Sequence, residues 1–346
     1  MGTDLIFRIV LIVIIFLISL VVAMYSTYAE RKIAAFFQDR IGPNRAGPWG
    51  ILQPLADGGK MFLKEEIIPT NATPFLFIVG PCLAILTACI GSAVIPWGQK
   101  MVVGGHTIDL QVTDINVGVL YIFGVVSLGV YGVMIGGWAS NNKYSLLGAI
   151  RAASQNISYE ISMGLSIIAL LMLTGTLSLK EIAEQQHGAN WNVIRQPLGF
   201  ILFIVCAFAE TNRTPFDLPE CETELVGGYH TEYSSMKLGF YLFAEYINMF
   251  ISSAVMATLY WGGYNYPGMD WVTAHVGPAI GPLIGTVVLF AKIFLFIFFF
   301  MWVRWTIPRF RYDQLMDLGW KILIPLAIGN IVLTGVVSTA LKHFGF

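Results

Sequence analysis

Long apolar runs constrain this chain more than any other feature. A helix needs about 20 apolar residues to cross a bilayer, because it rises about 1.5 Å per residue through a hydrocarbon core about 30 Å thick. Seven runs meet this requirement. An eighth, Leu198–Ala209, has 12 residues and can cross only if polar residues beyond Ala209 also lie at membrane depth or if preceding residues extend it. The eight predicted spans are 5–25, 75–95, 117–138, 161–179, 198–214, 238–262, 283–303 and 322–341.

The composition agrees with a membrane protein. Charged residues make up 12% of the 346 residues and hydrophobic residues 56%, whereas a soluble domain carries about 25% charged residues. The sequence therefore predicts an all-α integral membrane protein, a single polytopic domain over residues 1–346 whose surroundings are the lipid bilayer. A net charge of −1 gives no reason to expect nucleic acid as a partner.

The distribution of Lys and Arg predicts an orientation. Short cytoplasmic loops carry an excess of these residues, and the loops after spans 1, 3, 5 and 7 hold 14 of them against 3 in the opposite loops. We expect both termini on the non-cytoplasmic side. The first cytoplasmic loop contains Gln53–Glu66, in which Asp57, Lys60 and Lys64 share one helical face. This pattern predicts an amphipathic helix in the membrane interface, with an ordinary surface helix as the alternative.

A strongly acidic segment follows the short fifth span. Glu210–Glu232 holds six acidic residues and one basic residue, Arg213. Ionisable groups at membrane depth usually face a wet cavity, a partner charge or a proton path. A solvated acidic loop is the alternative, but the prolines of Thr214–Pro215 and Leu218–Pro219 stiffen this segment.

Other ionisable residues lie within or beside the apolar runs. Glu160 opens the fourth predicted span, Glu245 lies in the sixth and Lys292 near the middle of the seventh. Straight, untilted helices would bring these residues and Glu210 together in the inner half of the membrane. Clustered, desolvated carboxylates can exchange protons near neutral pH, which favours a relay over a set of structural polar groups.

Metal ligands and small residues give simpler expectations. The four cysteines form no CxxC pair and the five histidines lie outside the apolar spans, so we expect no metal or haem bound by this chain. Glycines at small-residue spacing predict close helix packing at two places, namely Gly132 with Gly136, and Gly277 with Gly281 and Gly285.

Three stretches of the sequence resemble a known family. Gly50–Glu65, GILQPLADGGKMFLKE, and Pro215–Gly228, PFDLPECETELVGG, resemble the two signature segments of the H subunit, also called subunit 1, of respiratory complex I, the proton-pumping NADH:quinone oxidoreductase. The run Ala29–Gly47, AERKIAAFFQDRIGPNRAG, also fits this family. The resemblance covers essentially the whole chain.

The resemblance implies an eight-helix membrane subunit without a redox centre of its own. Such a subunit forms part of a quinone chamber and couples quinone reduction to proton translocation. Its substrate would be ubiquinone or menaquinone. Its partners would be cluster-bearing peripheral subunits on the cytoplasmic face, and small and antiporter-like subunits in the membrane. The location would be an energy-coupling membrane such as the bacterial plasma or inner membrane.

Residue roles follow from the motif match and from membrane depth. The expected proton-relay residues are carboxylates, namely Glu160, Glu210, Asp217, Glu220, Glu222, Glu224 and Glu245. The expected quinone-chamber residues are Glu30, Arg31, Arg45 and Arg213, and Lys292 is expected as an intramembrane charge.

Two other functions fit parts of the pattern. The membrane anchor of an energy-converting hydrogenase would share the fold and the acids but match the first-loop motif less well. A stand-alone proton-coupled transporter would normally show internal repeats, and the acidic segment has no second copy in the sequence. Co-purification of soluble subunits and of quinone would distinguish these possibilities.

Overall fold

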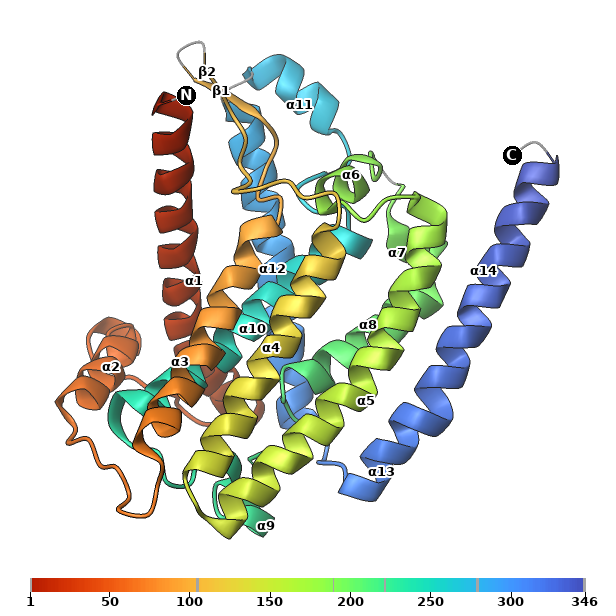
Figure 1. Ribbon diagram of the computed structural model, residues 1–346. Coiled ribbons are helices and arrows are strands. Elements are labelled where there is room, and N and C mark those ends of the chain that lie inside the picture. The colour runs from red at the N-terminus through yellow and green to blue at the C-terminus, as the bar shows by residue number, and fades with distance from the viewer. Residues whose placement is uncertain (1, 104–105, 189, 221, 278–279, 345–346) are drawn as a thin grey trace.

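The computed structural model describes residues 2–103, 106–188, 190–220, 222–277 and 280–344, and it is almost entirely helical (Figure 1). The long helices are α1 (Gly2–Phe37), α3 (Pro74–Ile90), α4 (Gly118–Ala139), α5 (Lys143–Thr174), α10 (Ser235–Tyr260), α12 (Ile280–Thr306) and α14 (Ile324–Phe344). The shorter helices are α2 (Gln53–Leu63), α6 (Leu179–Glu184), α7 (Asn192–Arg195), α8 (Pro197–Glu210), α9 (Glu222–Leu225), α11 (Met269–Val276) and α13 (Tyr312–Asp317). Among the described residues, β1 (Met101–Val103) and β2 (His106–Ile108) form one antiparallel hairpin in which Met101 pairs with Ile108.

Seven of the helices in the described part of the chain are long and apolar enough to cross a membrane. They correspond to the seven full-length runs of the sequence, so the helical membrane class is confirmed. Two of the helices extend well beyond the predicted spans. Helix α1 continues past Tyr25 to Phe37, and α5 begins at Lys143 rather than at residue 161.

The early start of α5 has a local cause. The side chain of Asn142 accepts a hydrogen bond from the backbone N–H of Tyr144, which caps the helix before its polar half begins. This half contains the buried polar residues Gln155 and Asn156. A hydropathy pattern does not detect a helical segment of this kind, because its buried face mixes small residues with polar ones.

The predicted short fifth span corresponds to α8. This helix has 14 residues and would rise about 21 Å, less than the thickness of a bilayer core. The chain after α8 is buried rather than solvated, because Arg213, Thr214, Phe216 and Asp217 are all buried. The Gln155 amide donates 2.8 Å hydrogen bonds to the carbonyls of Ala209 and Phe216, so backbone groups left open at the helix end find a partner.

Close glycine contacts join α3 to α4. A Cβ on Gly132 would lie 2.9 Å from both the Ala84 nitrogen and the Gly80 oxygen, and one on Gly136 would overlap the Tyr241 hydroxyl. The packing prediction is therefore confirmed for Gly132 and Gly136. In the second set, a Cβ on Gly281 or Gly285 would approach Thr273 or Tyr264. The prediction is wrong for Gly277, which has open space around it and a φ of +92° at the end of α11.

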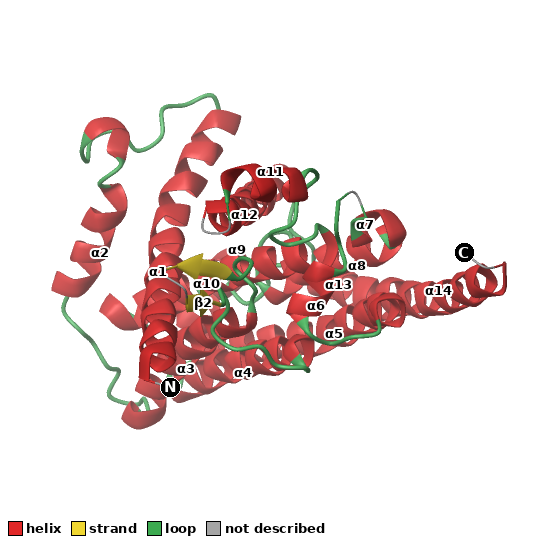
Figure 2. Cartoon of the chain, turned by 90° about the horizontal axis from the view of Figure 1, so that it is seen from above, coloured by secondary structure: helices red, strands yellow, loops and turns green. Residues whose placement is uncertain are grey.

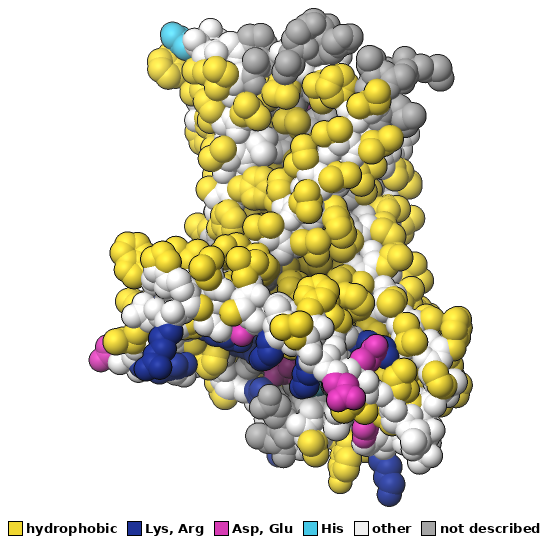
Figure 3. Space-filling model, turned by 90° about the vertical axis from the view of Figure 1, so that its left-hand side faces the viewer, with side chains coloured by type: hydrophobic (Ala, Val, Ile, Leu, Met, Phe, Trp, Pro, Cys, Tyr) yellow, Lys and Arg dark blue, Asp and Glu magenta, His cyan; other side chains and the backbone are white. Residues whose placement is uncertain are grey.

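The two ends of the bundle differ in character. Both chain ends lie at one end, together with the hairpin and α11, whereas α2, α9 and α13 lie at the other (Figure 1). Seen from above, α2 and α14 occupy opposite sides of the bundle (Figure 2). In Figure 3, charged side chains gather near one end, and apolar side chains cover the longer body above them.

The glycine contact between α3 and α4 predicts an asymmetric response to added methyl groups. Gly132→Ala should destabilise the protein by about 1–3 kcal/mol, because its Cβ would press on backbone atoms that cannot move without separating the helices. Gly124→Ala, in the same helix and with nothing within 4 Å, is the matched control. Thermal unfolding of the purified membrane assembly measures both, and equal midpoints would refute the packing account.

Candidate functional site

A cavity of about 220 Å³ lies between α1, α2 and α10. Helix α2 is held beside α1 by an ion pair in which Arg31 Nη1 lies 2.7 Å from Asp57 Oδ2. At its other end, the Ser235 hydroxyl donates to the carbonyls of Met61 and Lys64. The cavity is lined by the apolar residues Met24, Leu242, Phe243 and Trp305 and by polar residues that include Glu30, Arg31, Asp57 and Tyr246.

Glu30 forms the inner polar wall of this cavity and is almost fully buried, at 6% exposure. Its Oε2 accepts from Arg213 Nη1 at 3.0 Å and from the Tyr246 hydroxyl at 2.9 Å. Its Oε1 lies 2.7 Å from Arg304 Nη1. The Arg213 guanidinium also lies 4.2 Å from the centre of the Tyr246 ring, a cation–π contact. A buried carboxylate requires such partners, and here they come from three different elements.

Behind Arg213, the buried loop carries a second set of ionisable groups. Asp217 Oδ2 lies 2.9 Å from Arg309 Nη2, and Glu220 Oε1 lies 3.5 Å from His230 Nε2. Burial, and then the charge of Glu220, raise the pKa of Asp217 to about 7, although Arg309 opposes this change. Burial would also raise the pKa of Glu220, but His230 outweighs burial and lowers it. Burial lowers the pKa of His230, but the contact with Glu220 outweighs burial and raises it.

The next carboxylate is Glu245 on α10. Its Oε1 accepts a 3.0 Å hydrogen bond from the Tyr229 hydroxyl, so the end of the acidic loop is joined to α10. Gly228, directly before Tyr229, allows the end of the acidic loop to pass close to the backbone of Pro219. Its φ is +60°, and a Cβ there would collide with the Pro219 carbonyl.

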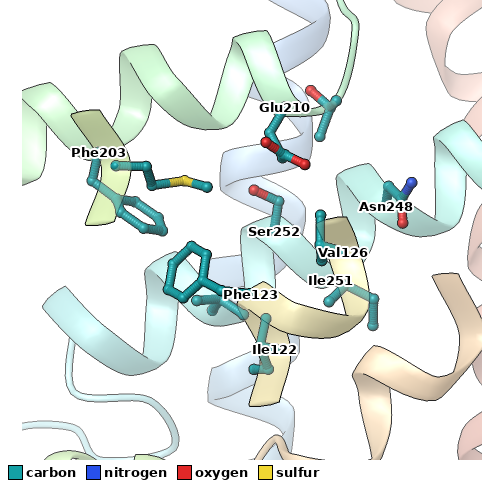
Figure 4. A pocket seen from close by; sticks show the side chains of 11 residues that line it. Ile122, Phe123, Val126, Phe203, Glu210, Asn248, Ile251 and Ser252 are labelled. Carbon is teal, nitrogen blue, oxygen red and sulfur yellow. The ribbon is translucent and has the colours of Figure 1, made fainter. Parts of the chain in front are cut away.

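Glu210 connects this region to the body of the bundle. Two cavities of about 40 Å³ each have Glu210 in their lining. One also contains Glu245 and Tyr229. In the other, the Glu210 carboxylate points from the end of α8 toward Ser252 (Figure 4). Cavities of this size can hold a water molecule when polar partners are present. Glu210 Oε2 has no hydrogen-bond partner among the described residues, so it is free to receive one.

Glu160 occupies the middle of α5, because that helix begins at Lys143, before the predicted span. The side chain is partly buried and interacts electrostatically with Glu210. This interaction agrees with the predicted convergence of the two carboxylates, although the helix that carries Glu160 starts earlier than the predicted span.

Three of the predicted site residues, Glu224, Arg45 and Lys292, lie outside this arrangement, and a fourth, Glu222, has a side chain that the structure does not describe. Glu224 is exposed, and its Oε2 pairs with Arg151 Nη1 at 2.7 Å. Arg45 is exposed in the loop before α2 and does not line the cavity there. Lys292 donates hydrogen bonds of 2.6–2.8 Å to the carbonyls of Trp261, Gly263 and Asn265, so it caps the end of α10 instead of joining the acids.

Several residues of the arrangement were not singled out in the sequence. Arg304 and Arg309 entered the orientation argument only as loop charges, whereas Arg304 is the last basic residue of α12. Tyr246 directly follows Glu245, which the sequence analysis did single out, so its position next to that acid could have drawn attention to it. Tyr229 and His230 lie directly after the second signature stretch, which could have extended the search. Within the described ranges, no cluster of His, Cys, Asp and Glu has the geometry to hold a metal ion.

Comparisons with known proteins identify the family. A family profile described as NADH dehydrogenase matches residues 9–335. The H subunit of the NADH-quinone oxidoreductase of Flavobacterium johnsoniae is 66% identical, over 96% of this chain and 95% of that protein. The H 1 subunit of the Cytophaga hutchinsonii enzyme is 68% identical over 94% and 95%, and the H subunit of the Thermomicrobium roseum enzyme is 48% identical over 90% and 90%. The chain belongs to the NADH dehydrogenase family.

Proposed function

We propose that this protein is the membrane subunit of a proton-translocating NADH-quinone oxidoreductase that forms part of the quinone chamber and couples quinone reduction to proton movement. The names of its relatives support the assignment to that enzyme, to other subunits as partners and to quinone as substrate. One structural observation carries the mechanism. Glu30 lines the cavity beside α2 and pairs with Arg213. From Arg213, a series of buried ionisable groups extends as far as Glu210.

The proposed topology has eight crossings. Seven long helices would place the chain ends on opposite sides, yet both lie at one end of the bundle (Figure 1). We therefore propose that α8 and the buried residues after it, up to about 214, form the remaining crossing. The exposed apolar residues Leu55, Phe62 and Leu63 suit α2 to the membrane interface. The Lys and Arg bias supports an orientation with both termini on the non-cytoplasmic side.

The cavity has the chemistry expected for part of a quinone chamber. A quinone has an apolar tail and two carbonyl oxygens, and it takes up two protons with two electrons. The apolar lining residues of the cavity suit the tail, and Arg31 has N–H donors besides the one that faces Asp57. In this proposal electrons come from a neighbouring subunit, and this chain supplies the wall and the responding charges.

The proposed coupling path begins at the Glu30–Arg213 pair. A change of charge in the cavity alters the field at Arg213, and Arg213 in turn influences Asp217, Glu220 and Glu245. The small cavity shared by Glu245 and Glu210 provides the next step, and Glu160 continues it into the bundle. Glu224 and its helix α9, which also contains Glu222, would be the access from the aqueous side, with Arg45 nearer the peripheral subunits.

Filling the cavity should impair quinone reduction selectively. Gly58 lines the cavity and its neighbour Gly59 does not, while a Cβ on either would meet nothing within 4 Å. Gly58→Leu should raise the KM for quinone or lower turnover by about tenfold, because its side chain occupies space that the substrate needs. Gly59→Leu should stay close to wild type. Activity with quinone is measured against NADH oxidation by a hydrophilic acceptor, and equal effects of both variants would count against the chamber.

Removing a titratable group should stop turnover and pumping together. Glu210→Gln and Glu245→Gln keep volume and hydrogen-bonding capacity but cannot exchange a proton. Each should lower both activities by at least about tenfold, since positioned proton transfer typically contributes about 100-fold or more. Glu→Asp at these positions should retain more of both, and Glu184→Gln, at an exposed site, should change neither. Normal turnover and pumping in assembled Glu→Gln enzyme would show that these acids are structural.

A further inference from the structure

A second polar cavity lies at the end of the bundle opposite α2, away from the proposed chamber. It has a volume of about 370 Å³ and lies between the beginning of α1 and residues 107–114. Arg8 of α1 and Lys180 of α6 line it, together with Asp109 and Asp114. Its size falls within the range of ligand sites, about 300–1,000 Å³.

The two cations and two carboxylates that line this cavity balance in number, but both carboxylates share one lysine, and among the described residues the other cation has no ion pair. Lys180 Nζ lies 3.4 Å from Asp109 Oδ1 and 4.0 Å from Asp114 Oδ2, so both carboxylates already face a lysine. Arg8 has no ion pair within the part of the chain that the structure describes, and it lies among apolar residues of α1. Arg8 is exposed, so its guanidinium can accept an external anion as a partner. The cavity therefore suits a ligand with a negative group near Arg8.

An apolar groove continues from this cavity along α1. The groove has a volume of about 120 Å³ and runs between Leu11, Ile14 and Ile18 of α1 and Leu283 and Phe290 of α12. Leu11 lines both spaces, so the groove begins where the cavity ends. Between Leu11 and Ile18, α1 rises about 10 Å. Ile14 and Leu283 are nearly half exposed, which leaves the groove accessible from the side of the bundle.

We propose that this cavity and groove bind a phospholipid from the bilayer. Its phosphodiester pairs with Arg8, and one acyl chain lies in the groove between α1 and α12. An ammonium headgroup, as in phosphatidylethanolamine, faces the open sides of Asp109 and Asp114, whose side chains are 51% and 46% exposed. The site requires insertion in a membrane but does not depend on the roles proposed for the acidic residues.

Photo-crosslinking in the assembled enzyme tests this site. The complex is reconstituted into vesicles that contain phosphatidylethanolamine with a diazirine in one acyl chain. After irradiation, label is quantified on peptides from α1 and α12. Label on α14, where Val332 and Val336 are exposed, measures contact with bulk lipid in the same sample.

Two variants and two matched controls decide the outcome. Arg8→Gln should lower the α1 and α12 label about fivefold, the effect of one cation that faces a phosphate. Ile14→Trp should lower it similarly by filling the groove. Arg195→Gln, an exposed arginine elsewhere, and Val13→Trp, beside the groove, should leave it unchanged. Label on α14 should stay constant throughout, and excess inorganic phosphate should not compete.

Three results would overturn the proposal. The first is that label on α1 and α12 of the wild-type protein does not exceed label on α14. This result would indicate contact with bulk lipid only, or a neighbouring subunit that covers the groove. The second is label that neither variant reduces. The third is loss with Arg8→Gln alone or competition by phosphate, which would indicate a site for a small anion without an acyl chain.

Discussion

The buried carboxylate of Glu30 is the interaction on which the rest of the site depends. It accepts from Arg213 and Tyr246 and pairs with Arg304, so the loop after α8, helix α10 and helix α12 must all meet α1 at one point. Removing one partner of a buried ion pair typically costs about 3–5 kcal/mol, because the remaining charge stays buried. The contacts of Glu30 thus join the end of α1 directly to the acidic loop.

This contact gives the loop two roles. Arg213 of this loop pairs with Glu30, which lines the cavity beside α2. Arg213 also interacts electrostatically with Asp217, Glu220 and Glu245. The loop can remain buried because its polar groups have partners, among them Gln155 for the backbone and His230 for Glu220. Charges held in a region of low dielectric interact strongly over short distances. A single change of charge at the cavity can therefore influence several carboxylates, which is what coupling requires.

The sequence predicted those features that depend on local patterns. Apolar runs located the seven long helices, and the short run at Leu198–Ala209 marked α8. The polar half of α5 escaped detection because its buried face pairs with the loop rather than with apolar side chains. Tyr246 and Arg304 could not be assigned to Glu30, since that contact joins residues far apart in the chain. Lys292 was placed with the acids by depth alone, whereas its helical face directs it to the carbonyls that follow α10.

A double-mutant cycle on Glu30→Gln and Arg213→Gln tests the central claim most directly. Quinone reduction by the assembled complex is measured for both single variants and for the pair, each normalised to NADH oxidation by a hydrophilic acceptor. If the two residues act as one unit, the double variant should be no worse than the poorer single variant, with a coupling energy of about 1 kcal/mol or more. Losses that add to within about 0.5 kcal/mol would show that the residues act independently and would contradict this account.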